Sequence, residues 1–291
     1  MRCGYVALVG RPNAGKSTLF NAFVGQRLSI VTAKPQTTRG RIIGILTDKD
    51  SQIIFVDTPG LLQPSYKLHE SMEKQIELAA READLALLLL DAVTPRDHLQ
   101  LVQRFLLKNR TPTLALLNKV DLVPEDRIKN LLSGLCRTFD LPQIKPISAL
   151  LNKNLDCLLE QIKTSLPEGP QLYPEDMIAE QPERFFAAEL IREAAFEHLE
   201  DELPYSVNIT IGEFVERTRE KSYILAIIYV ERESQKGIVI GRKASKLQAI
   251  GKQARKGIEE LIQHDVYLEL KVKVRSGWRN KDSALDEFGY L

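Results

Sequence analysis

The stretch GRPNAGKS at residues 10–17 constrains the fold of this chain more than any other feature. It follows the apolar run YVALV, opens a helical pattern and fits G-x-x-x-x-G-K-[ST]. In such a loop the glycines let backbone N–H groups point at phosphate oxygens, and the next helix adds partial positive charge. We expect Lys16 to reach the β- and γ-phosphates and Ser17 to ligate Mg²⁺. The residues expected to surround the phosphates are Gly10, Arg11, Pro12, Asn13, Ala14, Gly15, Lys16, Ser17 and Thr18.

The first 167 residues alternate short apolar runs with helical patterns. The runs YVALVG, IIFVDTPG, LALLLLDA, PTLALLNKVD and IKPISAL are candidates for buried strands, and each ends in polar or glycine-rich residues. Continuous apolar strands separated by helices favour an α/β fold, a mostly parallel sheet with helices on both faces. Ligands of such sheets gather at the carboxyl ends of the strands, so the polar ends of these runs are the expected site.

Two of these strand ends predict a nucleotide site. In FVDTPG, Asp57 is placed to hold Mg²⁺ through water, and Gly60 has no Cβ to keep its N–H from the γ-phosphate. In LLNKVD, Asp121 matches the two N–H groups of guanine that adenine lacks, and Asn118 is expected to hold the loop and touch the purine. After the last strand, the N–H of Ala149 is expected to meet guanine O6. The further residues expected at the nucleotide are Thr58, Pro59, Leu61, Lys119, Val120, Ser148 and Leu150.

The polar loop AKPQTTRGR, residues 33–41, lies between the phosphate loop and Asp57. Either Thr37 or Thr38 is expected to close over Mg²⁺ and the γ-phosphate, and the sequence does not distinguish them. This loop and the segment after Gly60 are expected to order with a triphosphate and relax after hydrolysis. The metal ligands expected are Ser17, Thr38 and Asp57, and the expected catalytic set is Lys16, Thr37, Thr38 and Gly60.

A domain of a different kind follows. We expect a first domain over residues 1–167, a proline-containing linker over residues 168–182 and a second domain over residues 183–291. The stretch ERFFAAELIREAAFEHLEDEL predicts an amphipathic helix from Glu183 to Leu203. Two β-rich runs, a pair of helices and a last strand then predict a compact α+β domain.

Positive charge is concentrated in this second domain. The whole chain has a net charge of +1, whereas residues 203–291 hold sixteen Lys and Arg against twelve Asp and Glu. Six basic and no acidic residues lie between Gly237 and Lys256. A local basic face favours nucleic acid, although a lone basic helix is more often only a solvated surface.

The motifs GRPNAGKS, QTTR, DTPG and NKVD, in this order, resemble those of the Era-like GTPases. In the second domain ELPYSV, IVIGRKASKLQAIGKQAR and VKVRSGWRNK resemble the C-terminal KH domain of that family, so the resemblance covers residues 5–291. It implies a P-loop GTPase domain followed by a type II KH domain. It also implies Mg²⁺-dependent GTP hydrolysis and binding to the 3′ end of small-subunit ribosomal RNA during assembly of the 30S subunit.

KH domains clamp the backbone of single-stranded RNA with a G-x-x-G turn between two helices. The turn here is GRKA at residues 241–244, and alanine replaces the second glycine although it resists a positive φ. The RNA contacts that the resemblance implies are Ile240, Gly241, Arg242, Lys243, Ala244, Lys246, Lys252 and Arg255. We expect Trp278 to pack the terminal strand rather than to stack on a base.

Leu61 stands where many GTPases have a glutamine that orients water, and it has no polar atom. We therefore expect slow intrinsic hydrolysis that relies on positioning and cation charge. The resemblance associates Asn13 with a bound K⁺ that supplies such charge; the alternative is that Asn13 only shapes the loop. Two other functions stay open. One is a GTP-gated RNA-binding chaperone with negligible hydrolysis, and the other is a membrane-associated GTPase whose basic helix touches anionic lipid.

Cysteine use and hydropathy predict the compartment. Three unclustered cysteines fit a reducing cytosol, and no signal peptide is visible. The apolar run LALLLL is far shorter than the ~20 residues of a membrane span. We expect a cytoplasmic monomer, with peripheral contact at the inner face of the cell membrane left open.

Overall fold

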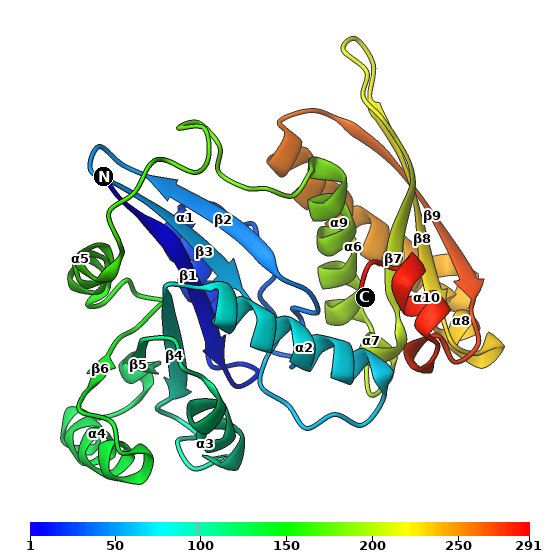
Figure 1. The fold of residues 1–291 in the computed structure, drawn as a ribbon. Coiled ribbons are helices and arrows are strands. Elements are labelled where there is room, and N and C mark those ends of the chain that lie inside the picture. The colour runs from blue at the N-terminus through cyan, green and yellow to red at the C-terminus, as the bar shows by residue number, and fades with distance from the viewer. Residues whose placement is uncertain (98) are drawn as a thin grey trace. The chain divides into compact units, whose positions relative to one another are not determined.

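The computed structural model describes residues 1–97 and 99–291, which form two compact units (Figure 1). The first unit comprises residues 1–29, 38–65 and 69–180, and the second comprises residues 30–37, 66–68 and 181–291. The second unit thus includes two short pieces from the first half of the chain. The domain boundaries expected above stay a prediction. Among the described residues, no helix combines the length and the apolar character needed to cross a membrane.

The first unit is built on a six-stranded sheet in the order β2-β3-β1-β4-β5-β6. Neighbouring strands are parallel except for β2, which pairs antiparallel with β3. This arrangement confirms the expected mostly parallel α/β fold. The apolar runs named above omit β2, whose hydrophobic pattern is interrupted by Gly44. The strands are β1 (Arg2–Gly10), β2 (Ile42–Thr47), β3 (Ser51–Asp57), β4 (Leu85–Asp91), β5 (Thr113–Asn118) and β6 (Ile144–Pro146).

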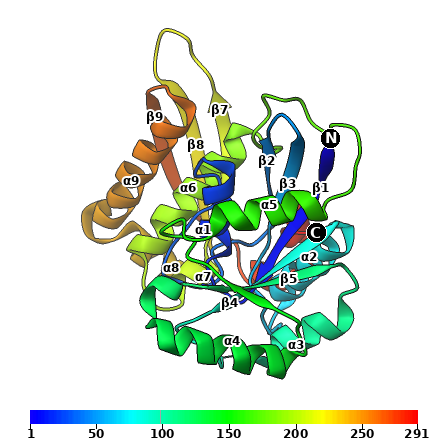
Figure 2. The same ribbon diagram turned by 90° about the vertical axis from the view of Figure 1, so that its left-hand side faces the viewer.

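Helices cover both faces of this sheet. Ile76, Phe105 and Leu135 belong to α2, α3 and α4 and pack into one hydrophobic core on one face. On the other face the ring of Phe23 in α1 stacks on Phe55 of β3 with 4.9 Å between centroids, and Figure 2 shows α5 in front of the strands near α1. The helices are α1 (Lys16–Val24), α2 (Lys67–Glu82), α3 (Leu99–Lys108), the 3₁₀ turn η1 (Val120–Leu122), α4 (Glu125–Phe139) and α5 (Leu155–Ser165).

The second unit is an α+β domain with a three-stranded sheet in the order β7-β8-β9. β7 is antiparallel to β8, and β8 is parallel to β9, which it reaches through α8 and α9. Alternate residues of β8 are buried, as expected for a strand with one face on a core, and that core includes Ile191, Ile228 and Ile250. The elements are α6 (Glu183–His198), α7 (Leu203–Ser206), β7 (Asn208–Val215), β8 (Ser222–Val230), α8 (Glu233–Ile240), η2 (Arg242–Ala244), α9 (Ser245–Ile262), β9 (Val266–Val274), η3 (Trp278–Asn280) and α10 (Asp282–Glu287).

The helix predicted from Glu183 to Leu203 ends earlier than expected, at His198. The ammonium group of Lys34 donates hydrogen bonds to the backbone carbonyls of Phe196, at 2.5 Å, and Leu199. The Phe196 carbonyl would otherwise accept an N–H from the next helical turn. A residue distant in the sequence therefore caps the end of the helix, and periodicity alone does not reveal it.

Candidate functional sites

The phosphate loop has the conformation that its sequence requires. Gly15 has a φ of 93°, and a Cβ at this position would lie 2.1 Å from Nδ2 of Asn118, so only glycine fits. The buried ammonium group of Lys16 donates to the carbonyls of Gly10 and Arg11 at 3.2 and 3.0 Å. Burial lowers the pKa of Lys16 to about 8, although the charge of Asp57 opposes the shift. The loop thus holds a cation within itself.

Oxygen donors gather around the fully buried Asp57 at the end of β3. Its Oδ2 accepts hydrogen bonds from the hydroxyls of Ser17 at 2.7 Å, Ser29 at 2.6 Å and Thr38 at 3.3 Å. Burial raises the pKa of Asp57, against the lowering effects of Lys16 and the three hydroxyls. Its other oxygen, Oδ1, is buried and has no hydrogen-bond partner among the described residues. A carboxylate and two hydroxyls are hard oxygen donors, so the set fits Mg²⁺.

The structure separates the two candidate threonines. The hydroxyl of Thr38 lies 3.1 Å from that of Ser17, and Thr38 is buried. Thr37 instead belongs to the second unit, where its carbonyl accepts a hydrogen bond from Arg192. Of the two threonines, the structure brings the Thr38 hydroxyl to the expected metal ligands.

The base-reading residues lie at the ends of β5 and β6. Asn118 is buried; its Nδ2 donates to the carbonyl of Ala14 at 2.8 Å, and its Oδ1 accepts the N–H of Ala149 at 2.9 Å. It therefore joins the phosphate loop to the last loop of the site. The Ala149 N–H expected at guanine O6 has this protein partner instead. Oδ1 of Asp121 is buried and has no hydrogen-bond partner among the described residues.

The turn after β3 lies directly against the phosphate loop. A Cβ on Gly60 would lie 2.6 Å from the backbone nitrogen of Pro12, and the N–H of Leu61 donates to the Gly10 carbonyl at 2.9 Å. The side chain of Leu61 packs against the hydrophobic core of α2, α3 and α4. Asn13 has a φ of 61°, a left-handed conformation that asparagine tolerates.

Several predicted residues have structural roles in the fold. The Thr58 hydroxyl donates to the Leu8 carbonyl at 2.7 Å, Val120 is buried in the hydrophobic core, and the Ser148 hydroxyl accepts the Leu151 N–H at 3.1 Å. These residues shape the loops. By contrast, 73% of Leu150 is exposed.

Two polar residues that bond to predicted site residues, Ser29 and Asp91, were not predicted from the sequence. Ser29 is buried and donates to Asp57, yet nothing in the run RLSIV around it indicates this contact. Asp91 ends β4 and accepts from Lys119 at 2.7 Å. The polar end of the run LALLLLDA is the signal that would have revealed Asp91.

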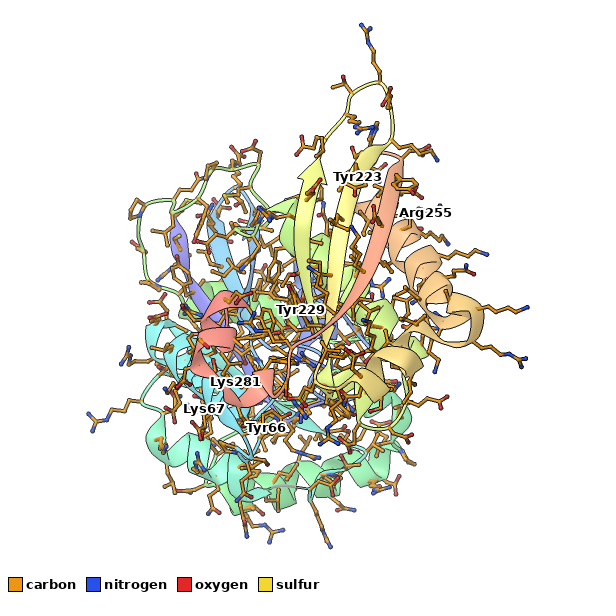
Figure 3. The ribbon with its side chains drawn as sticks, turned by 90° about the vertical axis from the view of Figure 1, so that its right-hand side faces the viewer. Tyr66, Lys67, Tyr223, Tyr229, Arg255 and Lys281 are labelled. Carbon is orange, nitrogen blue, oxygen red and sulfur yellow. The ribbon has the colours of Figure 1, made fainter. Side chains whose placement is uncertain are left out.

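In the second unit, the turn between α8 and α9 presents cations. Arg242, Lys243, Lys246 and Lys252 make no ion pair within the described ranges, whereas Arg255 lies 3.8 Å from Glu259. Figure 3 shows Arg255 extending from α9. The backbone turns through Lys243 and Ala244, both in the left-handed region with φ of 51° and 60°. The expected turn therefore forms with alanine at its last position.

A groove of about 330 Å³ lies between β9 and α9, the helix that follows this turn. Leu247, Leu268 and Leu270 give it apolar walls, and Lys252 and Arg255 give it positive charge. The RNA contacts expected from the sequence include Ile240 and omit the two β9 leucines. Trp278 packs as expected: it is fully buried, and its Nε1 donates to the Ser206 carbonyl at 2.9 Å.

The fold and the phosphate loop define the class: a P-loop GTPase domain joined to a KH domain. A family model described as "50S ribosome-binding GTPase" matches residues 5–119, and one described as "KH domain" matches residues 202–279. GTPase Era of Ruminiclostridium cellulolyticum is 42% identical over 291 residues, covering 99% of this chain and 97% of that protein. The chain therefore belongs to the Era family of GTPases.

Two solved structures resemble the chain over its full length. A variant of Aquifex aeolicus Era bound to GDP·AlF4⁻ is 38% identical, with a TM-score of 0.93 and complete coverage of both chains. Era in complex with MgGDPNP and nucleotides 1506–1542 of 16S ribosomal RNA is 39% identical, with a TM-score of 0.95, and the match covers 100% of this chain and 99% of that one.

Proposed function

We propose that this protein is a Mg²⁺-dependent GTPase that binds the 3′ end of small-subunit ribosomal RNA and acts in assembly of the 30S subunit. The observation that carries the nucleotide part is a pair of buried carboxylate oxygens, Oδ1 of Asp57 and Oδ1 of Asp121, that have no hydrogen-bond partner in the described part of the chain. Such atoms are costly unless a ligand satisfies them. A cation beside Asp57 and a guanine beside Asp121 do so. The RNA part is supported by the cationic turn and groove, and by the relative solved with a 16S ribosomal RNA fragment.

The residues around the phosphates would each have a different role in hydrolysis, set by their positions. Ser17, Thr38 and Asp57 would hold Mg²⁺, which when bound supplies positive charge beside the phosphates. Lys16 neutralises phosphate oxygens from within its loop, and Gly60 presents its backbone N–H to the γ-phosphate. Leu61 is packed into the core and offers no proton acceptor. Catalysis therefore rests on positioning and electrostatic stabilisation, which predicts slow intrinsic turnover.

We further propose that Asn13 contributes to a K⁺ site. The proposal predicts that replacing K⁺ by Na⁺ lowers the rate of GTP hydrolysis. An unchanged rate would assign Asn13 the loop-shaping role that its φ of 61° also fits.

A GTP-gated RNA chaperone with negligible hydrolysis is the second candidate function, and the apolar Leu61 favours it. Single-turnover hydrolysis on assembling ribosomal particles separates the two. Accelerated GTP cleavage supports the GTPase, and no cleavage supports the chaperone.

Substitution of Asp121 tests the base-reading role. Asp121→Asn should weaken GDP binding by about a thousandfold and favour xanthosine diphosphate, because xanthine presents an acceptor where guanine presents a donor. Calorimetric titration with GDP, xanthosine diphosphate and ADP measures this preference. The matched control is Asp126→Asn, an exposed position in the first turn of α4, which should bind GDP like the parent protein. Equal binding of ADP and GDP by the parent protein would refute the assignment.

We propose that the protein carries out this function in the cytoplasm as a monomer. The competing account, in which the basic helix binds the inner face of the membrane, predicts co-sedimentation with anionic vesicles that persists when RNA competes. The RNA-binding account predicts that RNA releases the protein from the vesicles.

A further inference from the structure

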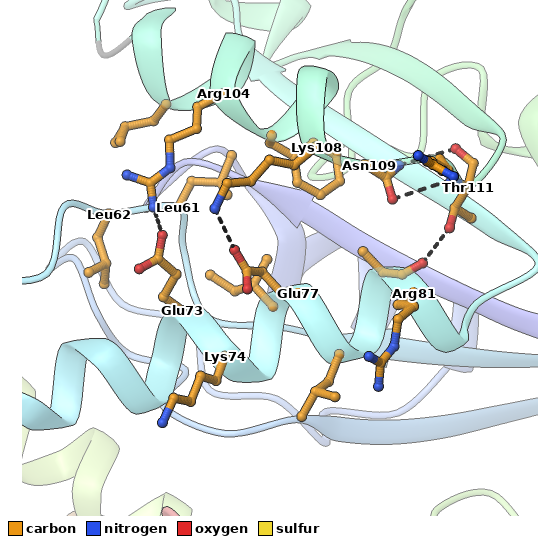
Figure 4. Close-up of a pocket in the computed structure, with 16 residues that line it drawn as sticks. Leu61, Leu62, Glu73, Lys74, Glu77, Arg81, Arg104, Lys108, Asn109 and Thr111 are labelled. Carbon is orange, nitrogen blue, oxygen red and sulfur yellow. Dashed lines mark hydrogen bonds and ion pairs between the residues drawn. The ribbon is translucent and has the colours of Figure 1, made fainter.

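A cavity of about 540 Å³ lies between α2 and α3 in the first unit (Figure 4). Its lining includes Leu61 from the residues expected at the nucleotide and no residue of the RNA groove. Its volume falls within the range of about 300–1,000 Å³ typical of small-molecule sites. Nothing in the proposed chemistry of GTP or RNA uses this cavity.

The interior of the cavity is apolar. Leu61, Ile76, Leu101 and Phe105 are among its lining residues. The polar groups at one end satisfy each other: the Thr111 hydroxyl, for example, donates to the Ala80 carbonyl at 2.6 Å. An occupant therefore needs an apolar body, because few buried polar groups are left to orient a polar one.

The rim of the cavity carries an excess of positive charge. Figure 4 shows two ion pairs linking α2 to α3, Glu73 with Arg104 and Glu77 with Lys108, the latter at 3.1 Å. These pairs use both carboxylates of the lining. The remaining cations, Lys74, Arg81 and Arg110, are exposed and make no ion pair or side-chain hydrogen bond within the described ranges. Figure 4 shows Lys74 and Arg81 extending from α2 on the side away from α3, so these long, exposed side chains would turn to reach a charged group at the mouth.

The cavity also touches the loop that faces the nucleotide. Leu61 lines its wall, and the backbone N–H of the same residue donates to the Gly10 carbonyl of the phosphate loop. A molecule that displaces the Leu61 side chain would strain this hydrogen bond.

We propose that the α2–α3 cavity is a binding site for a small anionic amphiphile: a soluble molecule with an aromatic or branched apolar body and one acidic group. The body fills the space between the helices, and the acidic group pairs with Lys74, Arg81 or Arg110 at the rim. The site is distinct from the RNA groove and meets the predicted nucleotide site at Leu61.

Two fluorescent probes test separately whether the site binds the apolar body and whether it favours the acidic group. Anilinonaphthalene sulfonate has an aromatic body and one sulfonate, and N-phenylnaphthylamine has the same body without the charge. With the full chain saturated in Mg²⁺ and GDP, the sulfonate should bind once per chain and about fivefold or more tighter than the neutral probe. Absence of sulfonate binding, or equal binding of both probes, would overturn the proposal.

A matched pair of variants places the probe in the cavity. Leu101→Trp fills the space and should weaken sulfonate binding by about tenfold or more. Leu107→Trp adds the same side chain on the same helix at a position that is 83% exposed, and should leave binding unchanged. Equal affinities of the two variants would overturn the proposal.

Charge removal tests the rim. Arg81→Gln should weaken sulfonate binding by about threefold and leave the neutral probe unaffected. Arg127→Gln, an exposed position in α4, is the control.

If Leu101→Trp does not fold, methyl NMR of the unmodified protein shows where the sulfonate binds. Sulfonate-induced shifts at Ile76 and Leu101 support the proposal, and shifts confined to Leu268 and Leu270 in the RNA groove refute it.

The link to the nucleotide rests on the proposed function. It predicts that sulfonate affinity differs at least about threefold between the GDP and GDPNP forms. A fluorescent GDP analogue checks nucleotide binding separately, so failure of the nucleotide site is distinguished from failure of the cavity. Probe binding without any such difference would reject the link and keep the cavity site.

Discussion

Ala244 occupies a backbone conformation that its side chain disfavours. Its φ is 60°, in the turn that opens α9, and its N–H donates to the Gly241 carbonyl at 3.1 Å. The left-handed region costs an L-residue roughly 1–2 kcal/mol, which glycine avoids. The surrounding helices hold the turn in place despite this cost, so the cationic loop forms without its second glycine.

Ala244→Gly should therefore stabilise the protein. Relief of strain outweighs the added freedom of the unfolded chain, and we expect the free energy of unfolding to rise by about 0.5–1 kcal/mol. Ala249→Gly within α9, the helix that follows the turn, is the matched control and should lose about 1 kcal/mol. Urea denaturation of both variants measures the two changes. Destabilisation by both substitutions would show that the turn places no strain on alanine.

At the residue scale the sequence predicts those residues whose chemistry is carried by a local motif. Lys16, Ser17 and Asp57 lie together as the motifs predict. Ser29 was not predicted, because its contact with Asp57 depends on how two segments fold against each other. Thr37 and Thr38 are distinguished only in the structure, where Thr38 belongs to the first unit and Thr37 to the second.

Among the elements, the β2–β3 hairpin is held by one acidic residue in its turn. Oδ1 of Asp48 accepts the N–H groups of Asp50 and Ser51 at 3.0 and 2.8 Å, and Oδ2 lies 2.9 Å from Nζ of Lys163 in α5. Partial burial alone raises the pKa of Asp48, but the ion pair and the hydrogen bonds prevail and lower it to about 2. The ionised form thus stabilises the hairpin against α5.

Asp48→Asn should reveal a pH-dependent contribution. The pKa is depressed in the folded state, so the stabilisation is present above the unfolded value near 4 and is lost as the pH falls toward 2. Since the side chain is 37% exposed, we expect about 1 kcal/mol at pH 7. Urea unfolding at pH 7 and at pH 3 measures it, with the exposed Asp50→Asn as control. A loss of the same size at both pH values would contradict the ionic origin.

The sequence predicts the helices and strands better than it predicts where they end. Strands and helices with a strong period, such as β8 and α9, follow from their patterns. The end of α6 does not, because Lys34 is supplied by a distant segment. The β9 leucines of the groove alternate with charged residues, which marks one face of a strand and gives no indication of what that face meets.

At the scale of the molecule, one segment between the phosphate loop and β2 belongs to the second unit. Residues 30–37 are part of that unit. There Glu193 accepts the Val31 N–H at 3.1 Å, and Lys34 bonds the end of α6. The residues on either side of this segment, Ser29 and Thr38, both donate to Asp57. We infer that a change at the metal ligands is passed along the backbone into the second unit.

Lys34→Met should weaken this coupling. It removes the ammonium hydrogen bonds to α6 and keeps the length of the side chain. We expect the ratio of RNA dissociation constants between the GDP and GDPNP forms to fall from about tenfold to about twofold. Lys49→Met, at an exposed turn position, should keep the ratio of the parent protein. Equal ratios in the two variants would show that Lys34 has no part in coupling.

The path from the metal ligands through residues 30–37 predicts that the bound nucleotide controls RNA affinity. The most direct test is one pair of dissociation constants. The dissociation constant for an RNA fragment from the 3′ end of small-subunit ribosomal RNA is measured with saturating Mg²⁺ and either GDP or GDPNP. Reciprocal linkage predicts binding about tenfold tighter with GDPNP. Identical dissociation constants in the two nucleotide states would contradict the account.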